Sequence, residues 1–447
     1  MRTRPTHRTV AALVGAALIA GCGGASERAA DPDGDPTGAT EGDRAAGRAF
    51  VGATLIDGSG GPPLEGAILL VGEDGRVDGV GPASAMTIPA DMEQIDVSGL
   101  YIVPGLINTH GHVGDTRGLE TGHYSRANVL DQLGVYARYG VTTVVSLGGD
   151  GAEGVAVRDE QDVPTLNRSR LYVAGPVVSG DTEDAVREMV DANAALGVDF
   201  IKIRVDDNLG ATQKMSPSVY RAVIDRAHER ELPVAAHLFY LEDAKGLLDA
   251  GVDFIVHSVR DVDVDDDLAR RMIETGVCYS PTLAREVTTF VYGDVPGFFD
   301  DPFFLAEADP AAIAGLSDPE AMARVRESPS AAAYRVALAQ AQENLGALSA
   351  AGVTIAMGTD TGPPGRFQGF YEHMELELMA ESGMSAAEIL VASTGDAADC
   401  VGREDIGVLE PGRWADFLVL EADPLADVRN LRAIRSVWIA GNEVPGR

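Results

Sequence analysis

The sequence predicts an α/β fold: a (β/α)8 barrel of the TIM type, with a small β-sandwich domain formed from both termini. Two observations predict it. Short apolar runs alternate with helix-patterned stretches between residues 104 and 403, and such alternation favours parallel strands joined by helices. Short β-type runs separated by Gly, Pro and Asp turns occur instead near both ends of the chain, in residues 48–103 and 404–447.

The barrel is expected over residues 104–403. Apolar runs predict strands at 142–146, 170–173, 200–203, 234–237, 254–257, 276–279 and 354–357. Apolar residues at helical spacing predict helices between them, at 184–196, 218–230, 241–250 and 265–275. About eight such units fit this length. Since active sites lie at the carboxyl ends of barrel strands, polar residues at these ends are the first candidates for function.

The two terminal segments are expected to form one discontinuous β unit. β-type runs occur at 50–56, 67–71 and 76–80, and similar runs return only at 414–420 and 436–440. The simplest arrangement is a single β-sandwich built from both termini, with the barrel inserted between them.

Residues 290–330 interrupt the alternation of strands and helices. They are rich in Asp, Pro and Phe, and a helix is expected after them at about 334–350. The segment is too long for a simple connection, so it is interpreted as a lid over the barrel mouth. A surface loop without such a role is the alternative.

The N-terminus predicts export. Arg2, Arg4 and Arg8 precede an apolar run that is too short to span a bilayer and is typical of a signal peptide. The run ends in Ile-Ala-Gly followed by Cys22, which resembles the bacterial lipoprotein processing box. We therefore expect a signal peptide over residues 1–21, lipidation of Cys22, and a disordered tether over 22–47. Ordinary secretion is the alternative.

A lipidated Cys22 would place the protein in the bacterial cell envelope, on the extracytoplasmic side (periplasmic or extracellular), with a lipid anchor as its only membrane contact. The net charge of −34 argues against nucleic acid or anionic headgroups as partners, so the expected partner is a small-molecule substrate. The oligomeric state is not predicted. Cys278 and Cys400 can pair in an oxidising compartment, but their spacing does not argue for a disulfide.

Costly polar residues recur at the predicted strand ends. They are His110, His112, Lys202, His237, His257 and Asp360. Alternate residues of a strand share a face, so His110 and His112 point the same way. Taken singly, each residue could have a purely structural role: an interior histidine, a lysine paired with Asp206 or Asp207, or an aspartate that caps a helix. Taken together at strand ends, they predict a metal site, because buried His, Lys and Asp need metals or partners.

Three longer stretches surround these residues. They are the apolar run 102–109 before His110, the run 250–257 that ends at His257, and the run 407–416 that returns to the sandwich. With the site residues, they resemble the amidohydrolase superfamily of metal-dependent hydrolases, in its imidazolonepropionase-like and Xaa-Pro dipeptidase-like branch. That resemblance covers essentially all of residues 48–445, and it implies the same barrel with a discontinuous β-sandwich.

The resemblance also implies roles for the candidate residues. His110 and His112 would bind a first metal, and His237 and His257 a second. Asp360 would touch the first metal and act as the catalytic proton shuttle, while Lys202 would be N-carboxylated and bridge both. Two divalent ions are therefore expected; zinc suits nitrogen and carboxylate ligands, with Mn²⁺, Co²⁺ and Fe²⁺ as alternatives.

The expected reaction is hydrolysis of an amide or cyclic amide C–N bond, in a dipeptide or an N-acyl amino acid, with a metal-bridging water as the attacking group. A lactonase or phosphotriesterase activity at the same site is the alternative, because a fold does not fix a substrate. A non-catalytic envelope scaffold is the third possibility, and retention of all the candidate ligands argues against it.

Three further residues near the site are considered, one for its support of the site and two as substrate contacts. Asn108 stands where many relatives carry Asp, and we expect only an indirect effect on the site. Arg204, which shares a strand face with Lys202, is a candidate to bind a substrate carboxylate; an ion pair with Asp206 or Asp207 is the alternative. Tyr240 is a candidate substrate contact or a packing residue.

Overall fold

Strands and helices alternate through the middle of the chain, as predicted. The computed structural model describes residues 47–446, so the predicted signal peptide and Cys22 lie outside the described residues. The alternating elements are β6 (Leu106–Gly111), α1 (Arg126–Arg138), β7 (Val141–Ser146), α2 (Ala152–Asp159), β8 (Arg170–Val173), α3 (Glu183–Leu196), β9 (Ile201–Arg204), α4 (Pro217–Glu229), β10 (Val234–His237), α5 (Leu241–Ala250), β11 (Phe254–Val256), α6 (Asp266–Thr275), β12 (Cys278–Ser280) and α7 (Leu283–Thr288).

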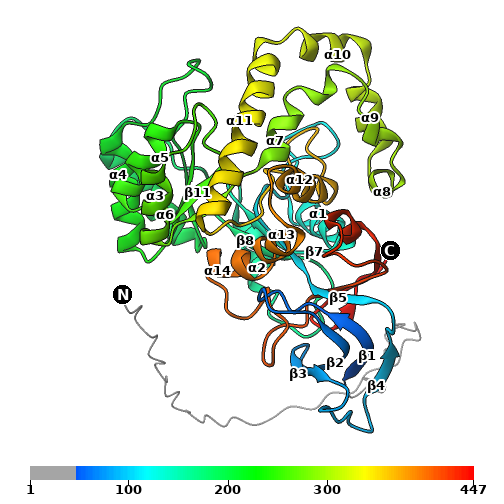
Figure 1. The fold of residues 1–447 in the computed structure, drawn as a ribbon. Helices are drawn as coiled ribbons and strands as arrows, with labels where there is room; N and C mark the ends of the chain where they lie inside the picture. Colours follow the sequence, from blue (N-terminus) through cyan, green and yellow to red (C-terminus); the bar gives the residue numbers. More distant parts are fainter. Residues whose placement is uncertain (1–46, 447) are drawn as a thin grey trace, which may run out of the picture. The chain divides into compact units, whose positions relative to one another are not determined.

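These strands pair in parallel and in chain order. One sheet has the order β6-β7-β8 and another the order β12-β11-β10-β9. Isolated parallel bridges connect them: Val178 pairs with Ile203 of β9, Ile355 with Tyr279 of β12, and Thr361 with Gly111 of β6. The series of pairings therefore returns to the strand on which it began. Figure 1 shows α3, α4, α5 and α6 gathered on one side of these strands.

The strand expected at 354–357 is not continuous. This segment makes isolated contacts instead: Ala356 N donates to Tyr279 O at 2.9 Å, and Met357 O accepts from Thr109 N at 2.9 Å. Met357 N donates to Ala392 O at 2.8 Å, at the end of a helix. Because that N–H leaves the strand ladder, no regular strand forms here, although the segment occupies the expected place.

A short connection from a helix to the next strand, which we call the Gly-Val-Asp-Phe device, occurs twice. The sequence Gly-Val-Asp-Phe follows both α3 and α5, and Gly197 and Gly251 end these helices in the left-handed conformation, which glycine adopts without strain. Asp199 Oδ2 then accepts from Val173 N at 2.9 Å, and Asp253 Oδ2 accepts from Val234 N at 2.8 Å. Each aspartate thus ties its turn to the preceding strand.

Both ends of the chain contribute to a separate sheet. Its order is β15-β14-β13-β5-β1-β2-β3, with β4 paired to β1, and Figure 1 shows the blue N-terminal strands of this sheet together. The rings of Phe50, Phe417 and Trp438 pack in its core, with Phe50 4.9 Å from Phe417. The strands are β1 (Arg48–Leu55), β2 (Leu64–Val71), β3 (Val77–Pro82), β4 (Glu93–Asp96), β5 (Tyr101–Pro104), β13 (Phe417–Leu420), β14 (Ile434–Ile439) and β15 (Asn442–Glu443).

The segment 290–330 is largely helical, which the sequence analysis did not predict. Asp301, Asp309 and Asp318 cap the starts of three short helices, each with proline at its first position; both features favour helix initiation. The elements are η1 (Val291–Gly293), η2 (Gly297–Asp300), α8 (Pro302–Leu305), α9 (Pro310–Leu316) and α10 (Pro319–Arg326), followed by α11 (Pro329–Ala351).

These helices pack against the last part of the alternating region. Tyr292 shares a 2.7 Å hydrogen bond with Tyr371 and donates to Gly365 O at 2.5 Å, and the ring of Phe304 lies 5.0 Å from that of Phe370. The remaining elements are α12 (Phe370–Glu381), α13 (Ala386–Ala392), α14 (Gly395–Cys400) and η3 (Val428–Arg432).

A disulfide joins Cys278 of β12 to Cys400 of α14, with their Cα atoms 5.8 Å apart. The sequence allowed this disulfide but did not predict it, because 122 residues separate the two cysteines and only the fold brings them together. Among residues 47–446, no helix is long and apolar enough to cross a membrane.

Candidate metal centre

Five of the six predicted site residues lie on the parallel strands or directly after them. His110 lies on β6 and His112 follows it, Lys202 lies on β9, and His237 ends β10. His257 follows β11, and Asp360 lies in the turn held by a 2.6 Å hydrogen bond from its own N–H to His110 O. The fold therefore brings together residues that are far apart in sequence.

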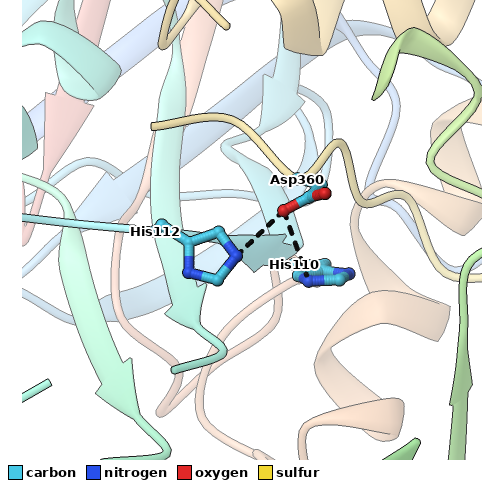
Figure 2. Close-up of side chains that lie close together, drawn as sticks. All are labelled: His110, His112 and Asp360. Carbon is cyan, nitrogen blue, oxygen red and sulfur yellow. Dashed lines mark ion pairs between the residues drawn. The ribbon is translucent and has the colours of Figure 1, made fainter. Parts of the chain in front are cut away.

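Three of these side chains form a compact group, shown in Figure 2. His112 Nε2 lies 2.9 Å from Asp360 Oδ1, and His110 Nε2 lies 3.7 Å from the same oxygen. One candidate ligand atom from each residue lies within 4.8 Å of the others. This is a spacing that a single metal ion could span with nitrogen and carboxylate ligands.

The other three residues continue from this group. Lys202 Nζ lies 3.3 Å from His110 Nε2. The ring centre of His257 lies 4.6 Å from that of His110 and 4.1 Å from that of His237. All six predicted residues thus lie in one continuous cluster.

Hydrogen bonds to residues outside the six-residue cluster orient three of the imidazoles. His112 Nδ1 lies 3.0 Å from Gly148 O, His257 Nδ1 lies 2.6 Å from Thr282 Oγ1, and His237 Nε2 lies 2.8 Å from Asp206 Oδ2. In each ring one nitrogen is engaged, and the other can act as a ligand. Such supporting bonds are usual around metal-binding histidines.

Burial sets the ionisation of the cluster. It lowers the pKa of His110 and His257 well below the ordinary value, and it lowers that of His237 to about 3 despite the hydrogen bond with Asp206. It also lowers the pKa of Lys202 to about 7, although Asp360 acts in the opposite direction. The imidazoles of His110, His237 and His257 are therefore neutral at pH 7, with lone pairs available to a metal.

Asp360 stays ionised for a different reason. Burial raises the pKa of its carboxyl group, but Arg366 and the hydrogen bond with His112 lower it more, so the pKa lies well below the usual range. Arg366 Nη1 lies 2.5 Å from Asp360 Oδ2. The cluster therefore offers neutral nitrogens and one anionic oxygen, a donor set that fits a divalent metal such as zinc.

Two of the cluster residues have unfavourable backbone geometry. His257 has φ 73° and Asp360 has φ 58°, in the left-handed region that side chains other than glycine rarely adopt. Such strain persists only where surrounding structure enforces it, and it concentrates at functional sites. Here Asp360 N bonds to His110 O at 2.6 Å and His257 N bonds to Ser280 O at 2.9 Å, and these bonds aim both side chains into the cluster.

A buried carboxylate connects two of the ligand-bearing segments. Glu372 Oε1 accepts from Asn108 Nδ2 at 2.6 Å, from Thr359 Oγ1 at 2.7 Å and from Thr361 Oγ1 at 2.6 Å. Asn108 Oδ1 in turn accepts from His110 N at 2.9 Å. Asn108 therefore supports the cluster without joining it, as the sequence analysis expected.

The two candidate substrate residues lie differently. Arg204 has a side chain that is 41% exposed; it pairs with Asp206 at 3.4 Å and hydrogen-bonds Asn208. The ion pair named as the alternative is thus the arrangement found. Tyr240 donates to Asp207 Oδ1 at 2.7 Å, and Lys214 Nζ lies 3.7 Å from its ring centre.

Sequence reasoning missed several charged residues around the cluster. Asp206, considered only as a partner for Arg204 or Lys202, bonds His237. Arg366 bonds Asp360, and Arg285 Nε lies 3.8 Å from Asp360 Oδ2. Arg285 and Arg366 lie outside the regular strands, so strand periodicity gives no direction for their side chains. Arg366 lies six residues after Asp360, and this proximity was a signal for Arg366 but not for Arg285.

The chain is similar to several known proteins. Residues 101–444 match the amidohydrolase family model. An uncharacterised protein of Mycobacterium tuberculosis (strain ATCC 25618 / H37Rv) is 27% identical over 378 residues, covering 81% of this chain and 88% of that protein. Ochratoxinase of Aspergillus niger is 26% identical over 292 residues, covering 62% of this chain and 53% of the enzyme.

A solved structure is similar over most of the chain. The crystal structure of a putative prolidase from Bifidobacterium longum superimposes with a TM-score of 0.73 and 28% identity, covering 90% of this chain and 95% of that one. The family and this neighbour imply an α/β barrel fold of the TIM type. The family model matches residues 101–444, which is most of the chain. The chain therefore belongs to the amidohydrolase family and is a hydrolase that acts on carbon–nitrogen bonds.

Proposed function

We propose that this chain is a metal-dependent amidohydrolase that cleaves an amide or cyclic amide bond in a small molecule, such as a dipeptide or an N-acyl amino acid. The observation that carries the proposal is the buried cluster of His110, His112 and Asp360, whose ligand atoms lie within 4.8 Å of one another. Lys202, His237 and His257 extend this cluster by the contacts described above.

The residues fit a pair of divalent metals. His110, His112 and Asp360 would hold one ion, and His237 and His257 the other, with zinc suited to the nitrogen and carboxylate ligands. Bound there, the metals would lower the pKa of a water molecule and polarise the scissile carbonyl group. His112, His237 and His257 would keep their orientation through Gly148, Asp206 and Thr282.

Lys202 and Asp360 would supply the proton and charge chemistry. A pKa of about 7 leaves much of the Lys202 amine neutral at neutral pH, and a neutral amine can add CO₂, with release of one proton, to give a carbamate. The carbamate would then be an anionic ligand shared by both metals. Asp360, held ionised beside Arg366, would take the water proton at its carboxylate and pass it to the leaving amine.

Metal analysis with a substrate panel tests this function. Purified protein would be loaded with zinc and assayed with N-acyl amino acids, dipeptides, cyclic amides, lactones and phosphotriesters. We expect amide hydrolysis, two metals per chain, and an intact-mass increase of one CO₂ that is absent from Lys202→Met. Asp360→Asn should lower kcat by about 100-fold or more.

Asp184→Asn is the matched control, since that side chain is 96% exposed, and its kcat should not change. Hydrolysis of lactones or phosphotriesters alone would replace the amidase assignment. Absence of both metal binding and hydrolysis would favour a non-catalytic scaffold.

We also propose the wider organisation predicted from the sequence. Residues 104–403 would form the (β/α)8 barrel, and residues 48–103 with 404–447 the discontinuous β-sandwich; the returning series of parallel pairings and the sheet built from both termini support this division. The chain would be anchored through lipidated Cys22 on the extracytoplasmic side of a bacterial membrane. Cys22→Ser should release the protein from the membrane fraction, and retention there would contradict the anchor.

A further inference from the structure

Arg285 lies on a helix that is fastened to the cluster. It belongs to α7, which follows β12, and Glu375 accepts hydrogen bonds from Leu283 N at 2.8 Å and Ala284 N at 2.7 Å. Thr282, just before this helix, holds His257 through its hydroxyl group. The position of the Arg285 backbone is therefore fixed relative to the imidazoles.

The guanidinium group of Arg285 is buried and only partly bonded. The residue is 8% exposed, and its Nη1 lies 3.0 Å from each carboxylate oxygen of Glu286. Its Nε has no hydrogen-bond partner within the described part of the chain, and it lies 3.8 Å from Asp360 Oδ2. A buried N–H without a partner is unfavourable, so this group is well placed for a ligand that the protein itself does not supply.

Glu286 does not neutralise its surroundings, because two arginines share it. Arg260 Nε lies 3.2 Å from Glu286 Oε1, an oxygen that Arg285 Nη1 also contacts at 3.0 Å. Arg260 itself is anchored, since its Nη1 donates to Ser258 O at 2.6 Å and Leu238 O at 3.1 Å. One carboxylate between two guanidinium groups leaves an excess of positive charge beside the cluster.

Two other arginines, Arg366 and Arg204, are already engaged with carboxylates of the site. Arg366 gives its Nη1 to Asp360, at 2.5 Å from Oδ2 and 3.3 Å from the carbonyl oxygen. Arg204 pairs with Asp206 and has a half-exposed side chain. Arg285 is thus the cation beside Asp360 whose bonding is incomplete. Two divalent metals in the same cluster would add further positive charge, which favours an anionic substrate.

An aromatic surface adjoins Arg285. Its guanidinium carbon lies 4.8 Å from the ring centre of Tyr334 on α11, and that of Arg260 lies 4.5 Å from the ring of Phe239. Phe239 and Tyr334 pack together with Tyr240 and Phe290 in one small apolar group. An anion bound at Arg285 would therefore have an apolar neighbour.

We propose that Arg285 determines substrate specificity by binding a free carboxylate next to the scissile amide, with an apolar or aromatic substituent against Tyr334 and Phe239. This role replaces the one first considered for Arg204, and it rests on the proposed amidohydrolase function. The ligand class is thus a carboxylate-bearing amide with an apolar side chain.

Paired substrates that differ only in this carboxylate test the assignment. N-acetyl-L-phenylalanine and N-acetyl-L-phenylalaninamide would be compared by acetate release from the zinc-loaded full chain. Arg285→Met should lower kcat/KM for the carboxylate by about 10- to 100-fold, the range of a hydrogen bond to a charged group, mainly through KM. Its kcat/KM for the carboxamide should not fall, and Arg285→Lys should recover part of the loss.

A binding measurement separates this proposal from the proposed function. Calorimetric titration with 3-phenylpropionate, which has a carboxylate and a ring but no amide, should show binding to the wild type and to Arg270→Met, an exposed arginine of α6. Binding should be lost in Arg285→Met. Equal losses for both substrates, or unchanged binding of 3-phenylpropionate, would overturn the role of Arg285. Binding at Arg285 without hydrolysis of any amide would overturn only the proposed function.

Discussion

Two buried arginine–carboxylate contacts in this molecule differ in how completely they are bonded. Arg170 and Asp416 connect β8 with the sheet built from both termini: Arg170 Nε lies 2.7 Å from Asp416 Oδ2, its Nη1 donates to Gln161 O, and its guanidinium stacks on Trp414 at 4.3 Å. Asp416 Oδ1 also accepts from Ala440 N at 2.7 Å. Arg285 and Asp360 are 3.8 Å apart, and Arg285 Nε is without a hydrogen bond in the described structure.

The difference separates a pair whose hydrogen bonds are complete within the protein from one whose hydrogen bonds are incomplete. Both contacts are buried, so burial and charge alone do not identify a site. The Arg170 pair satisfies its polar groups within the protein, as a stable interior requires. The groups around Asp360 are incomplete and lie beside residues with strained backbones, which is expected where metals and substrate complete the bonding.

The largest expected effect is on the structural pair. Asp416→Ala would leave Arg170 buried without its carboxylate, and loss of one member of a buried pair costs about 3–5 kcal/mol. Urea denaturation of metal-free protein measures this change in the free energy of unfolding, and the metal content of the loaded protein should stay the same. Asp184→Ala, at a side chain that is 96% exposed, is the control and should change the free energy by less than about 0.5 kcal/mol.

A loss of less than about 1 kcal/mol in Asp416→Ala, the range of surface ion pairs, would contradict this part of the comparison. It would mean that complete bonding does not distinguish the two contacts in energy. A fall in metal content with unchanged stability would instead place Asp416 among the residues that support the cluster.

A substitution within the cluster is expected to leave the free energy of unfolding unchanged or to raise it, unlike Asp416→Ala. Lys202→Met removes a buried amine that lies 3.3 Å from an imidazole, and replacing buried charged groups with apolar ones is often neutral or stabilising. We expect the free energy of unfolding of the metal-free protein to stay the same or rise by about 1–2 kcal/mol, while the metal content falls. Denaturation and metal analysis of the same samples check both.

The stability gain in Lys202→Met should depend on pH. Burial lowers the pKa of Lys202 from 10.5 to about 7, so in the wild type the cost of burying the charged amine is fully present below pH 7. It disappears as the pH rises towards 10.5, where the unfolded chain loses the same proton. Lys214→Met, at a lysine paired with Asp243 at 2.8 Å, is the control and should bind metal normally. A gain that is constant with pH would contradict a buried, titrating amine.

Most of the candidate cluster could be predicted from the sequence, because five of its six residues lie on regular strands or directly after them. Alternation along β6 places His110 and His112 on one face, and the strands ending at His237 and near His257 lie where their apolar runs predict. Helix α5 has the predicted bounds. Regular elements have fixed side-chain directions, and so their residues can be placed before the fold is known.

The rest of the site could not be predicted in the same way. Arg285 and Arg366 lie outside the strands, where direction depends on tertiary contacts such as the bonds of α7 to Glu375. The Cys278–Cys400 disulfide depends equally on the fold. The helices of residues 290–330 were missed although a signal was present: Asp followed by Pro at 301, 309 and 318 is a cap followed by a favoured first helical residue.

The smallest expected effect concerns His228, and it uses the repeated Gly-Val-Asp-Phe device as an internal comparison. Asp253 bonds His228 Nε2 at 2.9 Å, while the equivalent Asp199 bonds Arg158. The hydrogen bond with Asp253 raises the pKa of His228. A raised folded pKa means that this contact stabilises the protein below the ordinary value of 6.5, and that the contribution is lost as the pH rises through the folded pKa.

Because the His228 side chain is 43% exposed, solvent screens this pair, and His228→Gln should cost at most about 0.5 kcal/mol at about pH 5 and nothing at about pH 8. Arg158→Gln should lower stability equally at both pH values, since a guanidinium does not titrate there. Thermal unfolding at the two pH values, repeated in about 1 M salt to screen the charges, measures both variants. A loss of stability in His228→Gln that does not change with pH would show that the imidazole ring stabilises the turn by packing. The two copies of the device would then differ in geometry, and not only in whether the partner of the aspartate titrates.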